Sequence, residues 1–323
     1  MKILRRHSSL LVIMLSVAIL AVLPVIDRQQ STRETVFTIL RAVALASSLN
    51  ILLGYTGYIS FGHVVYLGFG GYVGFYLLSV QNAPLWAALL AGGFASALLA
   101  FLIGKAILRL RGAYFALATI GVNEAVSAFI KNFKPFGGSI GMELNFQVYK
   151  DMGGPAAALE FSFWMMVGIT FSVVLVSYLI KTSKFGLGLL AIREDEDAAE
   201  VIGVAAADAK TWAYVLSAFF PGIIGVLYFF KNGNIEPPTA FQLQTSIEML
   251  VMVMLGGPGM VLGPIFGAVG YQSIRSFLIT TPIFKNIQLA ISGVILLVFV
   301  LFAPTGIIGL ICKKAPSLRK VLQ

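Results

Sequence analysis

Charged side chains are rare in this sequence, so the few that lie inside long apolar stretches are the first candidates for chemistry. They are Arg41, His63, Glu124, Glu248 and Arg275. An isolated charge near the middle of a membrane helix costs about 3 kcal/mol on insertion scales, so each must face protein, water or an opposite charge. Such groups can line a solute pathway or relay protons. A structural ion pair, or for His63 a hydrogen bond to a neighbouring helix, explains them equally well.

Two glycine-rich interruptions divide the apolar stretches, at residues 50–74 and 255–270. Glycine costs a helix roughly 1 kcal/mol relative to alanine. In lipid, such density indicates either close helix packing or a broken helix whose backbone faces a cavity. A shift of 202 positions aligns the two segments faintly and places Gly57 on Gly259. Because paired interruptions are typical of transport pathways, the predicted pathway residues are Gly54, Tyr55, Gly57, Ser60, Gly62, His63, Glu124, Glu248, Gly256 and Gly257.

Residues 182–210 form the one long interruption that is dense in both signs of charge. Lys184 and Arg193 precede a run of acidic residues, and apolar side chains are interleaved with them. This pattern predicts a short helix or helix pair lying on a surface, ended by Gly203 as a C-cap. A solvated loop between two membrane helices is the plainer alternative.

The composition places the whole chain in lipid. Hydrophobic residues make up 58% and charged residues 11%, with a mean hydropathy of +0.91, whereas soluble domains are about a quarter charged. The long continuous apolar runs favour helices over a β-barrel. The net charge of +9 comes from residues that flank these runs, so it determines topology and does not indicate nucleic-acid binding. One cysteine, Cys312, excludes an intrachain disulfide.

The predicted fold is an all-α polytopic membrane protein, a single transmembrane domain over residues 1–323. About ten transmembrane helices are expected, with glycine-broken half-helices among them; nine is the alternative if residues 245–277 cross once. The predicted spans lie at residues 10–26, 35–53, 55–80, 85–105, 113–131, 161–180, 211–230, 245–255, 260–277 and 286–302.

The distribution of basic residues predicts the orientation. Ten crossings place the larger share of the 23 lysines and arginines on the side of residues 182–210. Positive loops stay in the cytoplasm. We therefore expect loop 182–210 and both termini to be cytoplasmic, and the polar loop 132–160 to be external.

No catalytic motif is present. The sequence lacks a GxxxxGK[ST] phosphate-binding loop, an HExxH metal motif and a nucleophile elbow. The chain is therefore expected to be no enzyme, with no catalytic residue, metal site or cofactor of its own.

Four ordered blocks resemble the LivM-type permease subunits of branched-chain amino acid ABC importers. They are LNILLGYTGYISFGHVVYLGFGGY (49–72), RLRGAYFALATIGVNE (109–124), SKFGLGLLAIREDEDAAEVIGV (183–204) and SIEMLVMVMLGGPGMVLGPIFGA (246–268). The spacing from Asp197 to Gly203 also resembles the EAA loop, the coupling helix of ABC-importer permeases. Asp197 stands where that pattern has Glu, and its later Ile-x-Leu-Pro element is absent.

The resemblance implies a bacterial inner-membrane subunit that pairs with a LivH-like permease. Two cytoplasmic ATPase subunits would bind ATP, and an external substrate-binding protein would deliver leucine, isoleucine or valine. It implies that contact with the ATPase falls to Arg193, Glu194, Asp195, Asp197, Ala198, Ala199 and Gly203. Two alternatives remain: a permease for urea or short amides in a related importer, and a stand-alone secondary transporter that couples protons through Glu124, Glu248 or His63.

Overall fold

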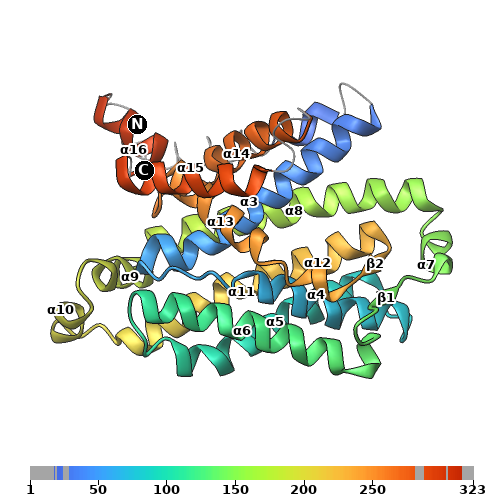
Figure 1. Ribbon diagram of the computed structural model, residues 1–323, viewed down its shortest axis with the longest axis horizontal. Coiled ribbons are helices and arrows are strands. Elements are labelled where there is room, and N and C mark those ends of the chain that lie inside the picture. The colour runs from blue at the N-terminus through green and yellow to red at the C-terminus, as the bar shows by residue number, and fades with distance from the viewer. Residues whose placement is uncertain (1–17, 19, 25–28, 281–286, 303–304, 315–323) are drawn as a thin grey trace.

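The protein is a bundle of helices, seen in a computed structural model that describes residues 18, 20–24, 29–280, 287–302 and 305–314 (Figure 1). Five helices are long and apolar enough to span a membrane: α3 (Gln30–Thr56), α5 (Leu85–Ile107), α6 (Ala113–Asn132), α8 (Pro155–Thr182) and α11 (Ala206–Asn232). The shorter α4 (Val64–Ser79), α13 (Leu243–Gly256), α14 (Gly263–Thr280) and α15 (Gln288–Phe302) run among them. The all-α membrane fold is thus confirmed, while the count of ten crossings stays a prediction.

Helices α3 and α11 form the centre of the bundle. The most apolar stretches of α3 and α11 are 83% and 78% buried, against 39% for α5 and 28% for α6. A helix that is apolar on every side belongs inside other helices or lipid. The outer face of α5 is a row of large apolar side chains spaced four residues apart: Trp86, Leu90, Phe94, Leu98 and Leu102. Exposure of this row to water would be unfavourable, so it indicates a surface in apolar surroundings.

Glycines bring α4, α5 and α11 into backbone contact. A side chain at Gly70 would meet Gly222 of α11 and the carbonyl of Gly92 in α5, and one at Gly74 would meet Val226 and Ala88. The Ser96 hydroxyl of α5 donates to the Tyr66 carbonyl of α4 at 2.8 Å. Close approach through small residues stabilises helix packing in lipid, where there is no hydrophobic drive between helices. These glycines therefore serve packing, one of the two explanations that the sequence left open.

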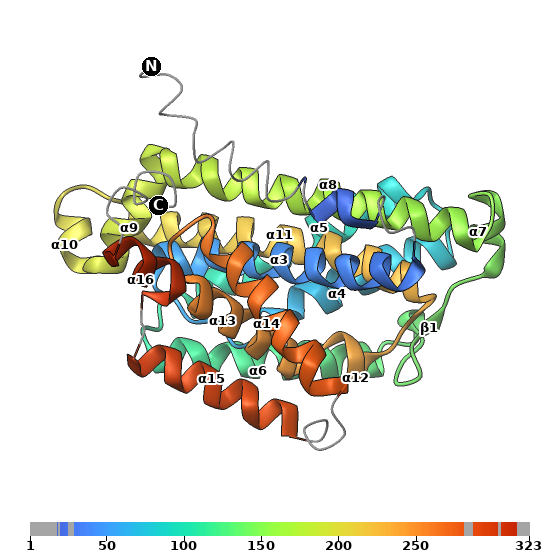
Figure 2. The same ribbon diagram turned by 90° about the horizontal axis from the view of Figure 1, so that it is seen from above.

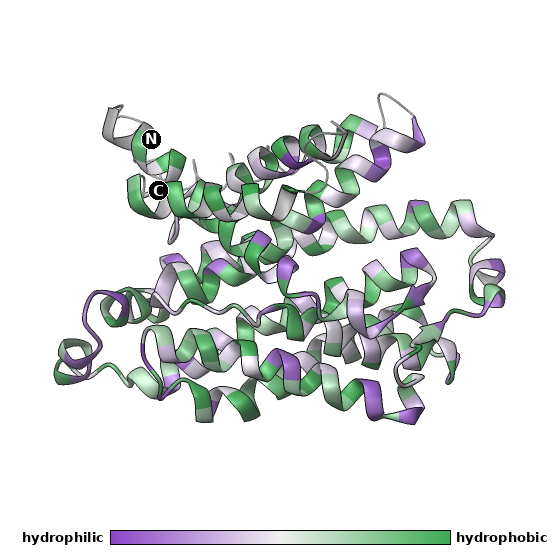
Figure 3. Cartoon of the chain, in the orientation of Figure 1, coloured by the Kyte–Doolittle hydropathy of each residue, from purple (hydrophilic) through white to green (hydrophobic). Residues whose placement is uncertain are grey.

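The loops gather at two opposite ends (Figures 1 and 2). At one end lie α9 (Lys184–Glu194) and α10 (Glu196–Val201), beside the α5–α6 loop. At the other end lie the 3₁₀-helix η1 (Lys134–Phe136) and α7 (Phe146–Asp151), while α12 (Pro237–Ala240) turns back into the bundle against α4 and α6. There the strands β1 (Met142–Glu143) and β2 (Asn234–Ile235) pair antiparallel. Figure 3 shows hydrophobic residues along the helices and many hydrophilic ones in these loops.

Most predicted spans match helices within a few residues, with two differences. The span at 55–80 is wrong as one helix: the chain is irregular from Gly57 to His63, and α4 starts only at Val64. The stretch 245–277 is divided into α13 and α14 at the glycine-rich break, and whether it crosses once or twice stays a prediction. The span at 10–26 and the basic tail lie largely outside the described residues. The last described element is α16 (Gly306–Lys314).

Candidate functional site

The two glycine-rich breaks lie against each other. Asn50, near the end of α3, donates from Nδ2 to the Met260 carbonyl at 3.1 Å and accepts at Oδ1 from the Gly259 N–H at 3.0 Å. Asn50 is fully buried. A side chain at Gly54 would clash with the backbone of Gly259. The Asn50 amide thus forms hydrogen bonds with two backbone groups of the α13–α14 break, the Met260 carbonyl and the Gly259 N–H. Backbone groups at membrane depth need such partners because no water is available there.

The faint internal repeat has a conformational counterpart. Gly57 ends α3 with φ 78°, and Gly259, its counterpart after the 202-residue shift, has φ 79°. This left-handed region is costly for other residues. Each glycine follows a helix and precedes a second one. The predicted helix breaks are therefore present in both segments.

A cavity of about 580 Å³ opens beside the first break. Its walls come from the end of α3, the extended segment after it, the start of α6, the end of α9 and the middle of α13. Apolar side chains dominate the lining: Leu53, Ile59, Phe61, Ile192, Leu250 and Met254. Arg111, Arg193 and Glu196 supply the charge. The volume is in the usual range of small-molecule sites, about 300–1,000 Å³.

Arg193 points from α9 into the bundle. Its Nη1 donates to the Gly54 carbonyl at 2.7 Å, and its side chain passes beside Gly57. Gly54 lies in the last turn of α3, where carbonyls lack intrahelical partners and carry partial negative charge. This guanidinium therefore joins the α9 helix to the first break, while Arg193 as a whole stays exposed, so its predicted contact with another subunit remains a prediction.

A buried ionic cluster ties α10 to the bundle. The Lys210 ammonium, from the first turns of α11, donates to Glu196 Oε1 at 2.6 Å, to the Tyr58 hydroxyl at 2.9 Å and to the Leu108 carbonyl at 3.1 Å. The Tyr58 hydroxyl donates to Glu196 Oε2 at 2.9 Å. Arg111 reaches Glu196 at 3.4 Å. We refer to Tyr58, Arg111, Glu196 and Lys210 as the ionic cluster.

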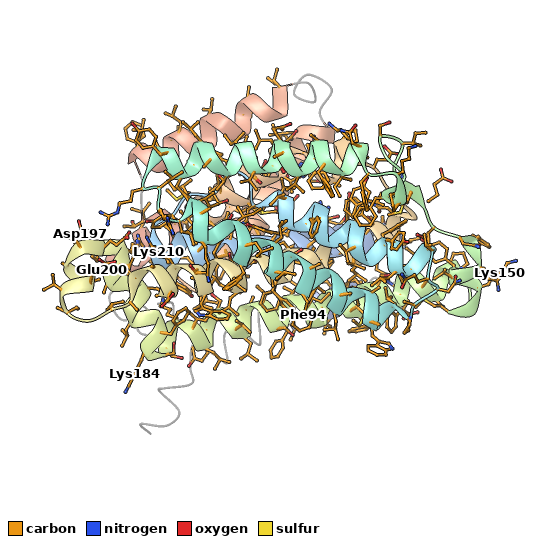
Figure 4. The ribbon with its side chains drawn as sticks, turned by 90° about the horizontal axis from the view of Figure 1, so that it is seen from below. Phe94, Lys150, Lys184, Asp197, Glu200 and Lys210 are labelled. Atoms are coloured by element: carbon orange, nitrogen blue, oxygen red, sulfur yellow. The ribbon has the colours of Figure 1, made fainter. Side chains whose placement is uncertain are left out.

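The cluster keeps its acids ionised. Burial alone would raise the pKa of the Glu196 carboxyl, but hydrogen bonds from Lys210 and Tyr58 offset this and lower the pKa below its usual value. A two-pronged contact from Arg111, at 2.8 and 3.2 Å, lowers the pKa of Asp197. Figure 4 shows Asp197, Glu200, Lys210 and Lys184 at the same end of the molecule, with Lys150 at the opposite end.

The charged segment folds as a pair of helices, one of the two forms predicted. Asp195 is extended between α9 and α10, and its side chain caps α10 by accepting from the Ala198 N–H at 3.0 Å. Residues 193–202 therefore do not form one continuous helix. α10 ends at Gly203 as predicted: the Gly203 N–H donates to Glu200 and the Val204 N–H to Ala199, both at 3.0 Å. This is a Schellman motif with glycine at φ 91°.

The surface of this pair combines apolar and acidic groups. Val201 is 87% exposed and Ile202 is 75% exposed. Other predicted contact residues also face solvent, namely Glu194, Asp195, Asp197 and Ala198, whereas Ala199 is buried. Beneath them a separate apolar cluster seats the pair on α3, α8 and α11: Ile51, Tyr55, Ile180, Leu189, Ile192, Ala199, Ala206 and Ala213. We refer to the exposed side of α10, with Asp197, Glu200, Val201 and Ile202, as the α10 surface.

Of the ten predicted pathway residues, Gly57 lines the cavity. Tyr55 is fully buried, with its hydroxyl 2.8 Å from the Ser177 hydroxyl in α8. Glycines 54, 62 and 256 contact other backbone segments so closely that any side chain would clash. Gly257 ends α13 at the second break, and Ser60 is fully buried. Most of these residues therefore hold the breaks together and do not face the cavity.

His63 compensates for a proline in α11. Pro221 lacks the N–H that would bond the Ser217 carbonyl four residues earlier. His63 Nε2 lies 3.0 Å from that carbonyl, and the Ser48 hydroxyl donates to it at 2.6 Å. The simple hydrogen bond to a neighbouring helix is the interpretation that this geometry supports.

The remaining intramembrane charges fall into two groups. Glu248 and Arg275 form an ion pair at 2.9 Å, with Gln244 donating to the same carboxylate at 3.1 Å. Arg41 stacks on the Tyr228 ring at 4.1 Å. Glu124 differs, because it is exposed on α6.

Sequence reasoning missed Asn50, Tyr58, Glu196 and Lys210 as site residues. Asn50 carried a detectable signal, since a buried amide in an apolar run needs backbone or side-chain partners. The cluster of Tyr58, Glu196 and Lys210 joins residues up to 152 positions apart, and no local spacing shows such a contact.

Residues 33–300 match the family model described as the permease component of branched-chain amino acid transport systems. Two curated relatives are the high-affinity branched-chain amino acid transport system permease proteins LivM of Salmonella typhimurium, 26% identical, and Escherichia coli, 25% identical. Each alignment covers 82% of this chain and 67% of the relative. A probable LivM of Methanocaldococcus jannaschii is 24% identical over 66% of both chains. No solved structure matches.

The family match covers most of the chain, including both breaks, the cavity and the α9–α10 pair. The relatives are transport subunits, which agrees with the absence of catalytic motifs from the sequence. This membrane protein belongs to the family of permease components of branched-chain amino acid transport systems.

Proposed function

We propose that this chain is one permease subunit of an ABC importer that passes leucine, isoleucine and valine into the cytoplasm. A LivH-like permease would complete the pathway, two ATPase subunits would bind ATP, and an external binding protein would deliver the substrate. The observation that carries the proposal is the α10 surface, a solvent-exposed apolar and acidic patch joined to the cavity through the ionic cluster.

The α10 surface suits docking to an ATPase. Val201 and Ile202 expose adjacent aliphatic side chains at the end of a capped helix, and apolar residues rimmed by charge are typical of interaction sites. Asp197 and Glu200 favour a groove with basic residues. In this proposal the α9–α10 end faces the cytoplasm of a bacterial inner-membrane protein, as do both termini.

Helix α6 is proposed to face the pathway and the second permease. Its exposed side carries Gly121, Glu124 and Ala128 beside the larger Tyr114 and Leu117, whereas the row along α5 from Trp86 to Leu102 is large and apolar throughout. A carboxylate facing lipid is strongly disfavoured. A side chain added at Gly121 would meet no atom within 4 Å, so packing within the described residues does not explain why a glycine stands at this position.

The stripe on α6 connects Glu124 with the cavity. Ala113 and Ala116 line the cavity, and Ile120 and Glu124 continue the same face at helical spacing. Leu250 and Met254 of α13 line the same cavity with apolar side chains. A branched-chain side chain would thus move along apolar walls.

Uptake by cells tests the proposal. Deleting this chain should abolish ATP-dependent uptake of labelled leucine, and unlabelled isoleucine and valine should compete in the parent strain. Ile202→Glu should lower uptake and substrate-stimulated ATP hydrolysis in the reconstituted complex, because a third acid enters the apolar contact. Ile202→Val, which keeps the surface aliphatic, is the matched control. Unchanged leucine uptake in the deletion strain would refute the proposal.

The two alternatives predict other outcomes. Loss of urea or amide uptake with intact leucine uptake would move the chain to a related importer. Uptake that survives ATP depletion but not collapse of the proton gradient would indicate secondary transport. His63 and Glu248 are already engaged by Ser217 and Arg275, which leaves Glu124 as the candidate for proton coupling among the three.

A further inference from the structure

We infer that the cavity beside Gly57 is a binding station for the substrate inside the permease, in which Arg193 holds the substrate carboxylate. This inference rests on the proposed import of branched-chain amino acids and adds a site within this chain. The ligand class is a small aliphatic amino acid with a free carboxylate.

The charge of Arg193 is available to a ligand. Arg111, which also lines the cavity, is compensated by Asp197, and Lys210 behind it is compensated by Glu196. Within the described residues no carboxylate lies within ion-pair distance of Arg193, whose Nη1 bonds a neutral carbonyl. A guanidinium has five donors in a fixed fork that suits a carboxylate, so donors remain after the Gly54 contact.

The start of α6 adds to the anion preference. Gly112, Ala113 and Ala116 line the cavity, and Gly112 occupies the N-cap position with no side chain to bond the first N–H groups. Those groups carry the positive end of the helix dipole. Thr56 and Gly57, at the end of α3, line the same cavity, and the negative end of that helix dipole favours an ammonium group there. The carboxylate and the ammonium group of a zwitterion would therefore each lie near a helix end of opposite partial charge.

The rest of the lining selects an aliphatic side chain. Leu53, Ile192, Leu250 and Met254 come from three different helices and surround the polar corner. Burying a leucine-sized side chain contributes favourably, whereas a charged or strongly polar side chain would lose water without a partner. A volume of about 580 Å³ leaves room for one amino acid and water.

Cysteine protection measures binding at this station directly. Ile59 lines the cavity and is 43% exposed, so Ile59→Cys in a Cys312→Ser background gives a reagent access to the wall. The complex is labelled in membranes, without the soluble binding protein, in the presence of leucine, leucinamide or urea. Leucine at about twice its dissociation constant leaves about one third of the sites empty, so it should slow labelling about threefold. Leucinamide, which lacks the carboxylate, should not.

Three variants separate the site from general damage. Arg193→Gln should abolish protection by leucine, and Lys184→Gln, which removes an exposed cation of the same helix outside the cavity lining, should keep it. Met254→Trp should abolish protection by filling the cavity while leaving Arg193 in place. A cysteine at Val201, 87% exposed on α10 and outside the cavity lining, should be labelled at the same rate with or without leucine.

The outcomes distinguish this site from the proposed function. A complex that imports leucine but shows no protection at Ile59→Cys overturns the station and leaves the permease proposal standing. Equal protection by leucinamide, or protection that survives Arg193→Gln, overturns the role of Arg193. A complex that fails to import leucine overturns the proposed function itself, and protection by urea then identifies the other substrate class.

Discussion

Replacing Lys210 by methionine tests whether the ionic cluster holds the α9–α10 pair in place. Methionine keeps the length and apolar stem of lysine but removes the cation and its three hydrogen bonds, to Glu196, Tyr58 and the Leu108 carbonyl. The lysine side chain is only 5% exposed and its Glu196 partner 14%. The variant therefore leaves a poorly hydrated carboxylate without its nearest cation.

The magnitude follows from this geometry. Breaking a buried ion pair by removing one partner costs about 3–5 kcal/mol. Arg111 lies 3.4 Å from the same carboxylate and partly compensates, so about 2–3 kcal/mol is expected. At about 2–3 °C per kcal/mol for a chain of this size, the apparent Tm should fall by roughly 4–9 °C. Uncoupling of ATP hydrolysis from import should accompany the fall.

The assay is thermal unfolding of the detergent-purified chain, followed by import in the reconstituted complex. Lys184→Met is the matched control, because Lys184 is exposed at the same end and should change the Tm little. Lys210→Met combined with Glu196→Gln should be less destabilised than the sum of the two single variants. Additive effects, or a Tm equal to that of the parent, would refute the idea that the cluster acts as a unit.

Four further predictions follow from the site. Asn50→Leu should destabilise the chain by about 3 kcal/mol, because it leaves the Gly259 N–H and Met260 carbonyl unpaired; a Tm unchanged within error in thermal unfolding would contradict this. Gly203→Val should cost about 1–2 kcal/mol through backbone strain alone, since open space surrounds this glycine, and Gly203→Asn should recover part of it in the same unfolding assay. Glu124→Gln should lower import several-fold while the chain still inserts, as measured by uptake per inserted protein; wild-type uptake would remove Glu124 from the pathway. Because the pKa of Glu196 is lowered from 4.5, its stabilisation should be present above pH 4.5 and be lost as pH falls through the lower value; unfolding of the parent and Glu196→Gln at several pH values should show a stability difference that shrinks only in acid.

The fold was largely predictable because membrane helices are specified locally. Continuous apolar runs fixed the long helices within a few residues, and the glycine clusters marked both breaks. The predicted end of α10 at Gly203 was correct for the same reason, since a helix end depends on neighbouring residues.

Side-chain direction was not predictable. Arg193 belongs to the charged segment by sequence, yet it turns inward to Gly54, because α9 packs its Leu189 and Ile192 face against the bundle. Among the glycines, density alone could not separate Gly57, which faces the cavity, from Gly256, which is pressed against the Gly263 backbone. Contacts between distant segments decide both questions, and one sequence does not contain them.

The proline in α11 determines where a movement of α10 can travel. The Ser217 carbonyl, freed by Pro221, is tethered by Ser48 of α3 and by His63 just before α4. The helix therefore cannot bend at this point without pulling on two other segments. Lys210, in the first turns of the same helix, holds Glu196 of α10. A displacement of α10 would therefore pass through Lys210 into α11, and from the tethered Ser217 carbonyl to α3 and to the start of α4 together.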